Sequence, residues 1–432
     1  MEQTQQVEQT QQTQQVEQEL LVSDDPRAVI GAPTSMRDVD LRARALHPHY
    51  ARFRVAERLL MTGHSHQAWP DVAREGLLEA FDVAAERVDA IWPVAFARIE
   101  HLRAYLRRWY ADPDGEYTPA ASTHDLLVKW LSALDLTARP RIVTTDGEFH
   151  SIARQLDRLE EEAIEVVRVP WHPVASLAER VAAAVDGRTA AVMVSRVLYE
   201  TALIVEGLSA IAVAARAHGA ALLVDDYHGT NVVPWSPLAE GLDDAHWVIG
   251  GYKYLQWGQG NCFLRAPADS VMRPVMTGWF ASFSTLSAPR TGEVRYDEGG
   301  SRFLGGTIEP ASAFRAARVV DFFEGQGLDA TTLRATSRLQ VGALRRAFDA
   351  LDLDPARLRQ KVGEPIERVG GFLALEGGAA IAFQRQLAAR GVLTDARGTT
   401  LRFGPAPYVT PTQIDDAMGV LAEVVRDTAV AA

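Results

Sequence analysis

The feature that most constrains the fold is an alternation of helix-like and strand-like segments between residues 122 and 266. Segments with apolar positions at helical spacing take turns with short, nearly continuous apolar runs. Strands of that kind are typical of a sheet that is covered on both faces. Repeated strand–helix–strand units imply right-handed crossovers and a mostly parallel sheet. The sequence therefore predicts an α/β fold, with a mostly parallel central sheet and helices on both faces.

Both kinds of segment can be placed on the chain. The predicted strands are 139–145, 164–170, 190–195, 220–225, 246–251 and 261–266, and the predicted helices among them are 122–136, 150–162, 175–185 and 208–219. Two earlier helices, 70–92 and 93–110, each carry a proline near the start, where a helix tolerates it. After residue 311 a long helical stretch leads into a smaller α+β region with strands at 370–377 and 400–407.

The chain is expected to divide into four parts. These are a disordered Gln-rich leader over 1–22, an N-terminal segment with a candidate active-site loop over 23–69, a large domain over 70–325 and a small α+β C-terminal domain over 326–432. The leader repeats TQQVEQ and has almost nothing to bury, which favours disorder, with a short helix or coiled coil as the alternative.

Composition excludes several classes of protein. The formal net charge of -12 disfavours a nucleic-acid or anionic-membrane surface. No apolar run approaches the roughly 20 residues that span a bilayer, and the N-terminus lacks the basic and apolar parts of a secretory signal. The single cysteine, Cys262, excludes an intramolecular disulfide. We therefore expect a cytoplasmic protein.

Candidate functional residues follow the predicted strands. In an open parallel sheet, ligands bind beyond the carboxyl ends of the strands. The residues at these positions are Phe149 and His150, then Asp225, Tyr227 and His228, then Tyr252 and Lys253, and Ser122 and Thr123 stand at the start of a helix. Each group has an ordinary structural explanation, but together they predict one site.

Lysine is scarce in this chain, which makes Lys253 conspicuous. The other two lysines, Lys129 and Lys361, lie on an amphipathic helix and in a polar stretch, where surface lysines are expected. Lys253 follows an apolar strand in the turn GGYKYLQWGQG. A lysine that forms an imine must be a neutral amine, and a partly buried, electropositive pocket favours that form by lowering its pKa. Lys253 is therefore the candidate imine-forming residue, with a surface lysine of no special role as the alternative.

Three further residues suit a pyridine cofactor. Asp225, at the end of a strand, can hold a proton on a pyridinium nitrogen, which pyridoxal 5'-phosphate (PLP) needs to act as an electron sink. The D-x-x-H spacing puts His228 beside the same ring, and Phe149 can supply an aromatic platform. A turn-capping acid and a core phenylalanine are the alternatives for Asp225 and Phe149. Together with Lys253, these residues predict PLP.

The phosphate and the substrate also have candidate partners. Ser122 and Thr123 precede an apolar-periodic helix, whose free N–H groups and dipole favour an anion. Helix capping uses the same N–H groups and is the alternative. Arg402, in TLRFGPAPY, carries the guanidinium fork that suits an amino-acid carboxylate, although it is one arginine among many.

These residues resemble a known family. The segments 192–234 and 246–264 look like the class V aminotransferase superfamily, and within it most like kynureninase. The D-x-x-H after a strand and the Y-K-Y-L turn with its trailing glycines carry the resemblance. Downstream, RPVMTGWFASFS, FLGGTIEP and LRFGPAPY resemble further kynureninase segments. The resemblance implies the PLP-dependent transferase fold type I.

The resemblance also implies a role for each matching residue. Lys253 would be the Schiff-base lysine, Asp225 would contact the pyridinium nitrogen and His228 would lie beside it. Tyr252 and Trp279 would bind the phosphate with Ser122 and Thr123, Phe149 would stack on the ring, Thr307 would face the site from the partner subunit, and Arg402 would hold the substrate carboxylate. The family implies a homodimer with active sites at the interface.

The sequence departs from the kynureninase pattern near the expected substrate side chain. Residues 149–152 read Phe-His-Ser-Ile where the family has Phe-Pro-Ser/Thr-Asp, so the second acid near the ring is lost. Residues 199–202 read Tyr-Glu-Thr-Ala in place of Tyr-Thr-Gly, and 63–67 read Gly-His-Ser-His-Gln in place of Gly-Asn-Ser. Thr307 stands where an asparagine is common. These differences make His64, Ser65 and His150 candidate substrate-binding residues, and no metal site is expected at His64 and His66.

The predicted function is that of a PLP-dependent enzyme acting on a small L-α-amino acid, with kynureninase-like lyase or hydrolase chemistry at the β and γ carbons. Lys253 would move the α-proton and Tyr252 would serve as an acid/base relay. Other class V reactions, namely transamination, elimination, replacement and epimerisation, stay open, as does a non-catalytic PLP-binding protein. Cysteine desulfuration is disfavoured because Cys262 lies inside a predicted strand. A nucleotide-binding dehydrogenase is disfavoured because no G-x-G-x-x-G follows an early strand.

Overall fold

The structure is a computed structural model that describes residues 31–287, 289 and 292–428. The predicted leader over 1–22 lies outside the described residues. No helix in the described part of the chain is long and apolar enough to cross a membrane.

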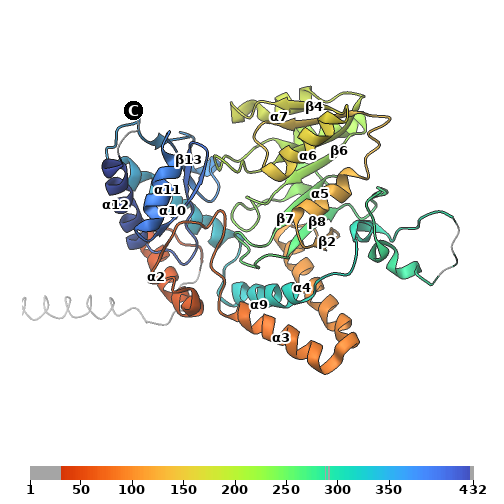
Figure 1. Ribbon diagram of the computed structural model, residues 1–432, viewed down its shortest axis with the longest axis horizontal. Coiled ribbons are helices and arrows are strands. Elements are labelled where there is room, and N and C mark those ends of the chain that lie inside the picture. The colour runs from red at the N-terminus through yellow and green to blue at the C-terminus, as the bar shows by residue number, and fades with distance from the viewer. Residues whose placement is uncertain (1–30, 288, 290–291, 429–432) are drawn as a thin grey trace, which may run out of the picture.

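A seven-stranded sheet forms the centre of the large domain (Figure 1). Its strands, in spatial order, are β4 (Glu165–Val169), β3 (Arg141–Thr145), β5 (Thr189–Ser195), β6 (Ala221–Asp225), β7 (His246–Gly250), β8 (Cys262–Ala266) and β2 (Glu116–Ala120). The five strands from β4 to β7 are parallel, and β8 runs antiparallel to both of its neighbours. The predicted mostly parallel sheet is confirmed.

Helices cover both faces of this sheet, which explains the uninterrupted apolar strands. They are α5 (Thr123–Leu131), α6 (His150–Glu161), α7 (Leu177–Ala183) and α8 (Leu208–His218). Met193 of β5 packs in one apolar cluster with residues of α5 and α6, and its neighbour Val192 packs in another with residues of α7 and α8. Because successive strand residues point to opposite faces, both must be apolar when both faces are buried.

The edge strand β2 is absent from the sequence-based expectation. Pro119 lies inside it, and proline argues against a strand in a central position. The structure resolves the conflict because β2 pairs on one side only, with β8. An edge strand tolerates proline, since the missing N–H is not needed by a second neighbour.

Three long helices pack beside the large sheet. They are α3 (Val72–Arg87), α4 (Trp92–Tyr110) and α9 (Ala311–Gly325), and α9 packs against both α3 and α4. Helix α9 ends at the residue where the sequence predicts a domain boundary. The division into large and small domains stays a prediction.

The C-terminal part is a smaller α+β unit (Figure 1). Its antiparallel sheet contains, in spatial order, β12 (Asp395–Arg397), β13 (Thr400–Phe403), β10 (Leu373–Glu376) and β9 (Arg359–Gln360). The helices of this unit are α10 (Ala330–Asp349), α11 (Ala380–Ala389) and α12 (Pro411–Asp427). The N-terminal segment joins this unit, because α2 (Met36–Leu46) packs on α10 and α12, and β1 (Leu59–Leu60) pairs with β11 (Val392–Leu393). Strand β1 thereby directs the loop at residues 61–70 back toward the large domain.

Candidate active site

A cavity of about 280 Å³ lies at the carboxyl ends of β6 and β7. Seven of the residues predicted for the site line it, namely Ser122, Thr123, Phe149, Asp225, His228, Tyr252 and Lys253. These residues come from four separate segments of the chain, and the parallel sheet brings them together at one edge. Their individual roles stay predictions.

Lys253 follows β7 and is almost completely buried, with 6% of its surface exposed. Its Nζ lies 2.5 Å from His228 Nε2. The same nitrogen lies 4.4 Å from the centre of the Tyr227 ring and 5.5 Å from that of Phe149. Burial lowers the pKa of Lys253 to about 7, although the nearby Asp225 charge favours the protonated form. Lys253 therefore has the neutral-amine character that imine formation needs.

Asp225 is the last residue of β6 and faces the cavity. Its Oδ1 accepts a hydrogen bond of 2.8 Å from the backbone N–H of Tyr227. Burial raises the pKa of Asp225 to about 6. The adjacent Asp226 has a different role, because its carboxylate accepts hydrogen bonds from Arg196 Nε at 2.6 Å and from Tyr110 at 2.7 Å. Of the two successive acids, only Asp225 lines the cavity.

Tyr227 and Cys262 line the same cavity; the sequence places Tyr227 among the candidate residues without a specific role and assigns Cys262 no site role. The Tyr227 ring packs directly over Gly250, where any Cβ would lie 1.6 Å from the ring. Gly250 is therefore needed so that Tyr227 can lie beside Lys253. Cys262 is buried in β8, and burial raises the pKa of its thiol to about 11. This thiol stays protonated at neutral pH, in agreement with its interpretation as a structural residue.

Glu148 is a buried acid that the sequence reasoning missed. Its carboxylate accepts hydrogen bonds of 2.6 Å from Thr145 Oγ1 and from Ser195 Oγ, and one of 3.1 Å from the Ser195 backbone N–H. Ser195 pairs with Asp225 in the β5–β6 register. Burial, with a smaller contribution from the Asp225 charge, raises the pKa of Glu148 to about 7. The position of Glu148 in the sequence, directly before Phe149 and after a buried strand, could have identified it as a candidate site residue.

The N-terminus of α5 closes one end of the cavity. Ser122 is the N-cap residue, and its Oγ accepts a 3.2 Å hydrogen bond from the Asp125 backbone N–H. The capping alternative is therefore realised for Ser122. The free N–H groups of the first helical turn are still available to an anion, whose charge the helix dipole would favour.

Of the predicted substrate-binding residues, none lines this cavity. His64 is fully buried against the Phe372 ring, at 4.6 Å between centroids, and both its ring nitrogens lack a partner. Ser65 donates a 3.1 Å hydrogen bond to Thr62 within its own loop. His150 is exposed beside the Tyr199 ring. From the same N-terminal loop, His66 stacks on the Tyr252 ring at 5.0 Å between centroids.

Arg402 is buried in β13 and already has a protein partner. Its Nε lies 3.1 Å from Asp395 Oδ1, a second nitrogen contacts the same oxygen, and NH1 donates to the Tyr199 carbonyl at 2.6 Å. The Arg402 guanidinium lies 5.6 Å from the centre of the Phe372 ring. The sequence did not predict Asp395, because the spacing between these two residues becomes contact only when β12 and β13 pair.

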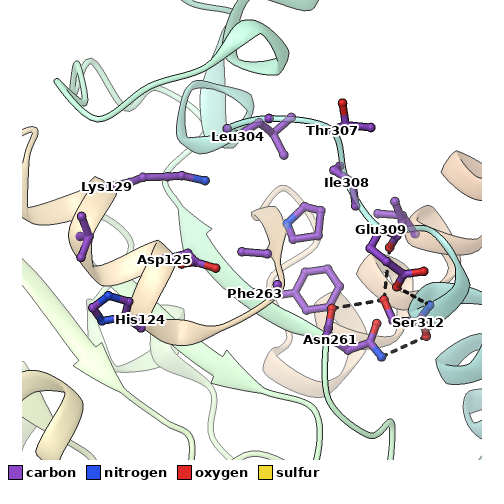
Figure 2. A pocket seen from close by; sticks show the side chains of 18 of the residues that line it. His124, Asp125, Lys129, Asn261, Phe263, Leu304, Thr307, Ile308, Glu309 and Ser312 are labelled. Carbon is purple, nitrogen blue, oxygen red and sulfur yellow. Dashed lines mark hydrogen bonds between the residues drawn. The ribbon is translucent and has the colours of Figure 1, made fainter.

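Trp279 and Thr307 lie away from Lys253 within one chain. Trp279 is 46% exposed and packs on Phe280. Thr307 lines a second, larger cavity of about 710 Å³ (Figure 2). The two cavities share Ala121, His124 and Gly260. The predicted contact of Thr307 with a partner's site stays a prediction.

The other two lysines are less exposed than their sequence context indicates. Lys129 points across the larger cavity toward the segment of Leu304 in Figure 2, and burial lowers its pKa. Lys361 forms a 2.6 Å ion pair with Glu200. The surface interpretation of both residues was therefore incomplete, since packing across elements covers their aliphatic stems. Among the described residues, no group of three or more metal-ligating side chains could hold a metal ion.

No protein-family model and no curated sequence matches this chain. Its structure matches several solved enzymes. The cystine C–S lyase C-DES, in complex with cysteine persulfide, has a TM-score of 0.70 at 19% identity and covers 85% of this chain and 98% of its own. The cysteine desulfurase of Thermococcus onnurineus NA1 has a TM-score of 0.71 at 15% identity, covering 89% and 98%. The cysteine desulfurase CsdA of Escherichia coli has a TM-score of 0.69 at 16% identity, also covering 89% and 98%.

A C-DES mutant with glycine covalently linked to its PLP cofactor has a TM-score of 0.71 at 18% identity. None of the structures named here is a kynureninase, so the kynureninase-like chemistry stays a prediction. The likeness shows the fold, and it confirms the predicted architecture: the chain has the α/β fold of the PLP-dependent cysteine desulfurases and C–S lyases, fold type I.

Proposed function

We propose that this protein is a PLP-dependent enzyme that acts on an L-α-amino acid. The observation that carries the proposal is the convergence of Lys253, His228 and Asp225 on one cavity of about 280 Å³. The match to solved structures of PLP enzymes supports it independently through the fold.

The donor set of the cavity fits the chemical groups of PLP. The aldehyde and the phenolic oxygen of a pyridoxal ring are on neighbouring atoms, and Lys253 Nζ and His228 Nε2 lie 2.5 Å apart. Asp225 supplies a carboxylate for the ring nitrogen, and the α5 N-terminus supplies N–H groups for the phosphate. His228 Nδ1 is buried and has no hydrogen-bond partner among the residues that the structure describes, so it can hydrogen-bond a bound group without losing an existing contact.

Each of three cavity residues would have its own chemical role. When bound, PLP supplies an electron sink for the electrons left at the substrate Cα. Asp225 would hold a proton on the ring nitrogen, and its burial keeps the carboxylate out of water. Lys253 would anchor the aldehyde as a Schiff base and, once released, accept the α-proton as a neutral amine. Tyr252, at the wall of the same cavity, would relay a proton.

Within this class, we propose kynureninase-like cleavage of the Cβ–Cγ bond of a 3-acylalanine. As the Cβ–Cγ bond breaks, one water supplies the hydroxyl that joins the acyl carbon and the proton that joins Cβ, so the products are alanine and a carboxylic acid. The Y-K-Y-L turn, the D-x-x-H spacing and Phe149 support this reaction. The buried thiol of Cys262 supports the exclusion of a cysteine nucleophile in this cavity.

A second candidate is β-elimination at a carbon–sulfur bond, because one solved enzyme of similar fold is a cystine C–S lyase. Such a reaction breaks the Cβ–S bond and gives pyruvate, ammonia and a thiol or persulfide. It needs Lys253 and Asp225 in the same roles, so the cavity residues suit both candidates.

The products decide between the two reactions. PLP-loaded protein is incubated with L-kynurenine, other 3-acylalanines and L-cystine, and alanine, pyruvate and ammonia are measured. Alanine from a 3-acylalanine supports hydrolytic cleavage, and pyruvate with ammonia from L-cystine supports elimination. Lys253→Ala is the control and is expected to abolish both. Keto-acid-dependent turnover without either product would contradict the proposal for the reaction.

We also propose a homodimer whose active sites lie at the interface. The segment between β8 and α9 extends to the side of the large domain (Figure 1). It carries the exposed apolar residues Val271, Val275, Met276, Trp279, Phe283, Leu286 and Val294. Apolar patches of this kind mark association surfaces.

A further inference from the structure

Asp395 lies between two arginines, Arg397 of β12 and Arg402 of β13. Its Oδ1 is held by Arg402, and its Oδ2 lies 3.5 Å from Arg397 NH2. The three residues are brought together by the β12–β13 pairing, in which Asp395 is opposite Arg402. The Asp395 side chain is only 14% exposed, so water screens its charge weakly.

The Asp395 contact leaves part of the Arg402 fork free. A guanidinium has five N–H donors, and three protein contacts use the Nε and both terminal nitrogens once each. Each terminal nitrogen carries a second N–H that these three contacts do not use, and guanidinium N–H groups are suited to a carboxylate. The Asp395 carboxylate therefore fixes the position of the Arg402 guanidinium and balances its charge.

The net charge of this cluster comes from Arg397. With Asp395 and Arg402 paired, the cluster keeps one positive charge, on a side chain that is 49% exposed. Burial lowers the pKa of His66, and the Arg397 charge acts in the same direction. Burial raises the pKa of Tyr252, and the Arg397 charge opposes that rise, so Arg397 is in electrostatic reach of the cavity. The nearby acid Glu200 is itself paired with Lys361.

We propose that Asp395 sets the charge of the carboxylate pocket to one positive unit, and so restricts the enzyme to amino acids without a second negative group on the side chain. The proposal rests on the proposed function and names its substrate class. The α-carboxylate would take the free N–H groups of Arg402 and the charge of Arg397. A second anionic group would meet the Asp395 carboxylate with no cation left to compensate it, and like charges at close range disfavour binding.

A matched pair of unreactive ligands tests this. L-Isovaline and α-methyl-L-aspartate differ by a methyl against a carboxylate, and neither has an α-proton to lose. Their dissociation constants for PLP-loaded protein are measured by calorimetry at two salt concentrations. We expect L-isovaline to bind about tenfold more tightly. In Asp395→Asn, whose amide oxygen still accepts from Arg402, the ratio should fall to about one. In Arg397→Gln both ligands should weaken about tenfold, the ratio should persist and the salt dependence should shrink.

The control is Arg385→Gln, which removes an exposed arginine of α11 and should change neither constant. Equal binding of the two ligands to the wild type, or an unchanged ratio in Asp395→Asn, would overturn the proposal. The imine absorbance and the circular dichroism of each variant show that it is folded and loaded. Protein that takes up no PLP refutes the proposed function, whereas loaded protein without selectivity refutes this inference alone.

Discussion

Burial of Lys253 determines when its amine can react. The folded environment lowers the pKa of Lys253 to about 7, so the neutral fraction rises as the pH increases through about 7 and is nearly complete above it. An exposed lysine would be half in the neutral form only near pH 10.4. The low proton affinity of this one side chain is a precondition of the proposed chemistry.

The first prediction concerns this pH dependence. When PLP is added to cofactor-free protein, the rate of imine formation should increase as the pH rises through about 7 and then become constant. The imine absorbance, followed after rapid mixing, measures the rate. A rate that keeps rising up to about pH 10 would show that Lys253 is not in the environment described here.

At the residue scale, sequence position identified the residues whose placement depends on one strand. Phe149, Asp225 and Lys253 each follow a strand and meet at the cavity. Glu148 was not predicted because its partner Ser195 is distant in the sequence, and Asp395 was not predicted because its contact with the nearby Arg402 depends on the pairing of β12 with β13. Pairing between strands creates those contacts, and no local pattern reports it.

Helix α5 is capped at its N-terminus by Ser122, and we propose that the same N-terminus binds the PLP phosphate. Ser122→Ala should remove the cap at a cost of about 1 kcal/mol in unfolding free energy. It should also weaken PLP about tenfold by loosening the first turn that faces the phosphate. Thermal unfolding and titration of the imine absorbance measure the two effects. Pyridoxal, which lacks the phosphate, should bind the variant and the wild type equally.

A matched cap elsewhere provides the control. Asp329 caps α10 by accepting from the Thr332 backbone N–H at 2.8 Å. Asp329→Ala should lose similar stability and keep its affinity for PLP. If both variants lose PLP affinity in proportion to stability, the phosphate does not bind at α5.

At the element scale, the sequence predicted the six strands whose apolar runs are continuous, from β3 to β8. It did not predict β2, because Pro119 masks an edge strand. The sequence also did not predict that β8 runs antiparallel to β7. Strand direction depends on how the chain returns to the sheet, and a periodic pattern contains no such information.

For the whole molecule, the central expectation is association of two chains. Phe283 is 48% exposed on the segment between β8 and α9, and it lines neither cavity. Phe283→Glu should convert a dimer to a monomer, because a buried unpaired charge costs several kcal/mol at an interface. Sedimentation velocity measures the change. The monomer should also bind PLP more weakly if partner residues complete the site.

The matched control for Phe283→Glu is Phe81→Glu on α3, which is 72% exposed and far from that segment in the sequence. It should leave the sedimentation coefficient unchanged. A wild-type protein that sediments as a monomer at micromolar concentration would contradict the proposed dimer.

The most direct test of the account is to locate the covalent attachment of PLP. Borohydride reduces the imine to a stable amine, and peptide mass spectrometry then identifies the lysine that carries the pyridoxyl group. The chain offers only Lys129, Lys253 and Lys361. We predict one pyridoxyl group, on Lys253, and none in Lys253→Ala. A label on either of the other lysines, or no label at all, would contradict the account.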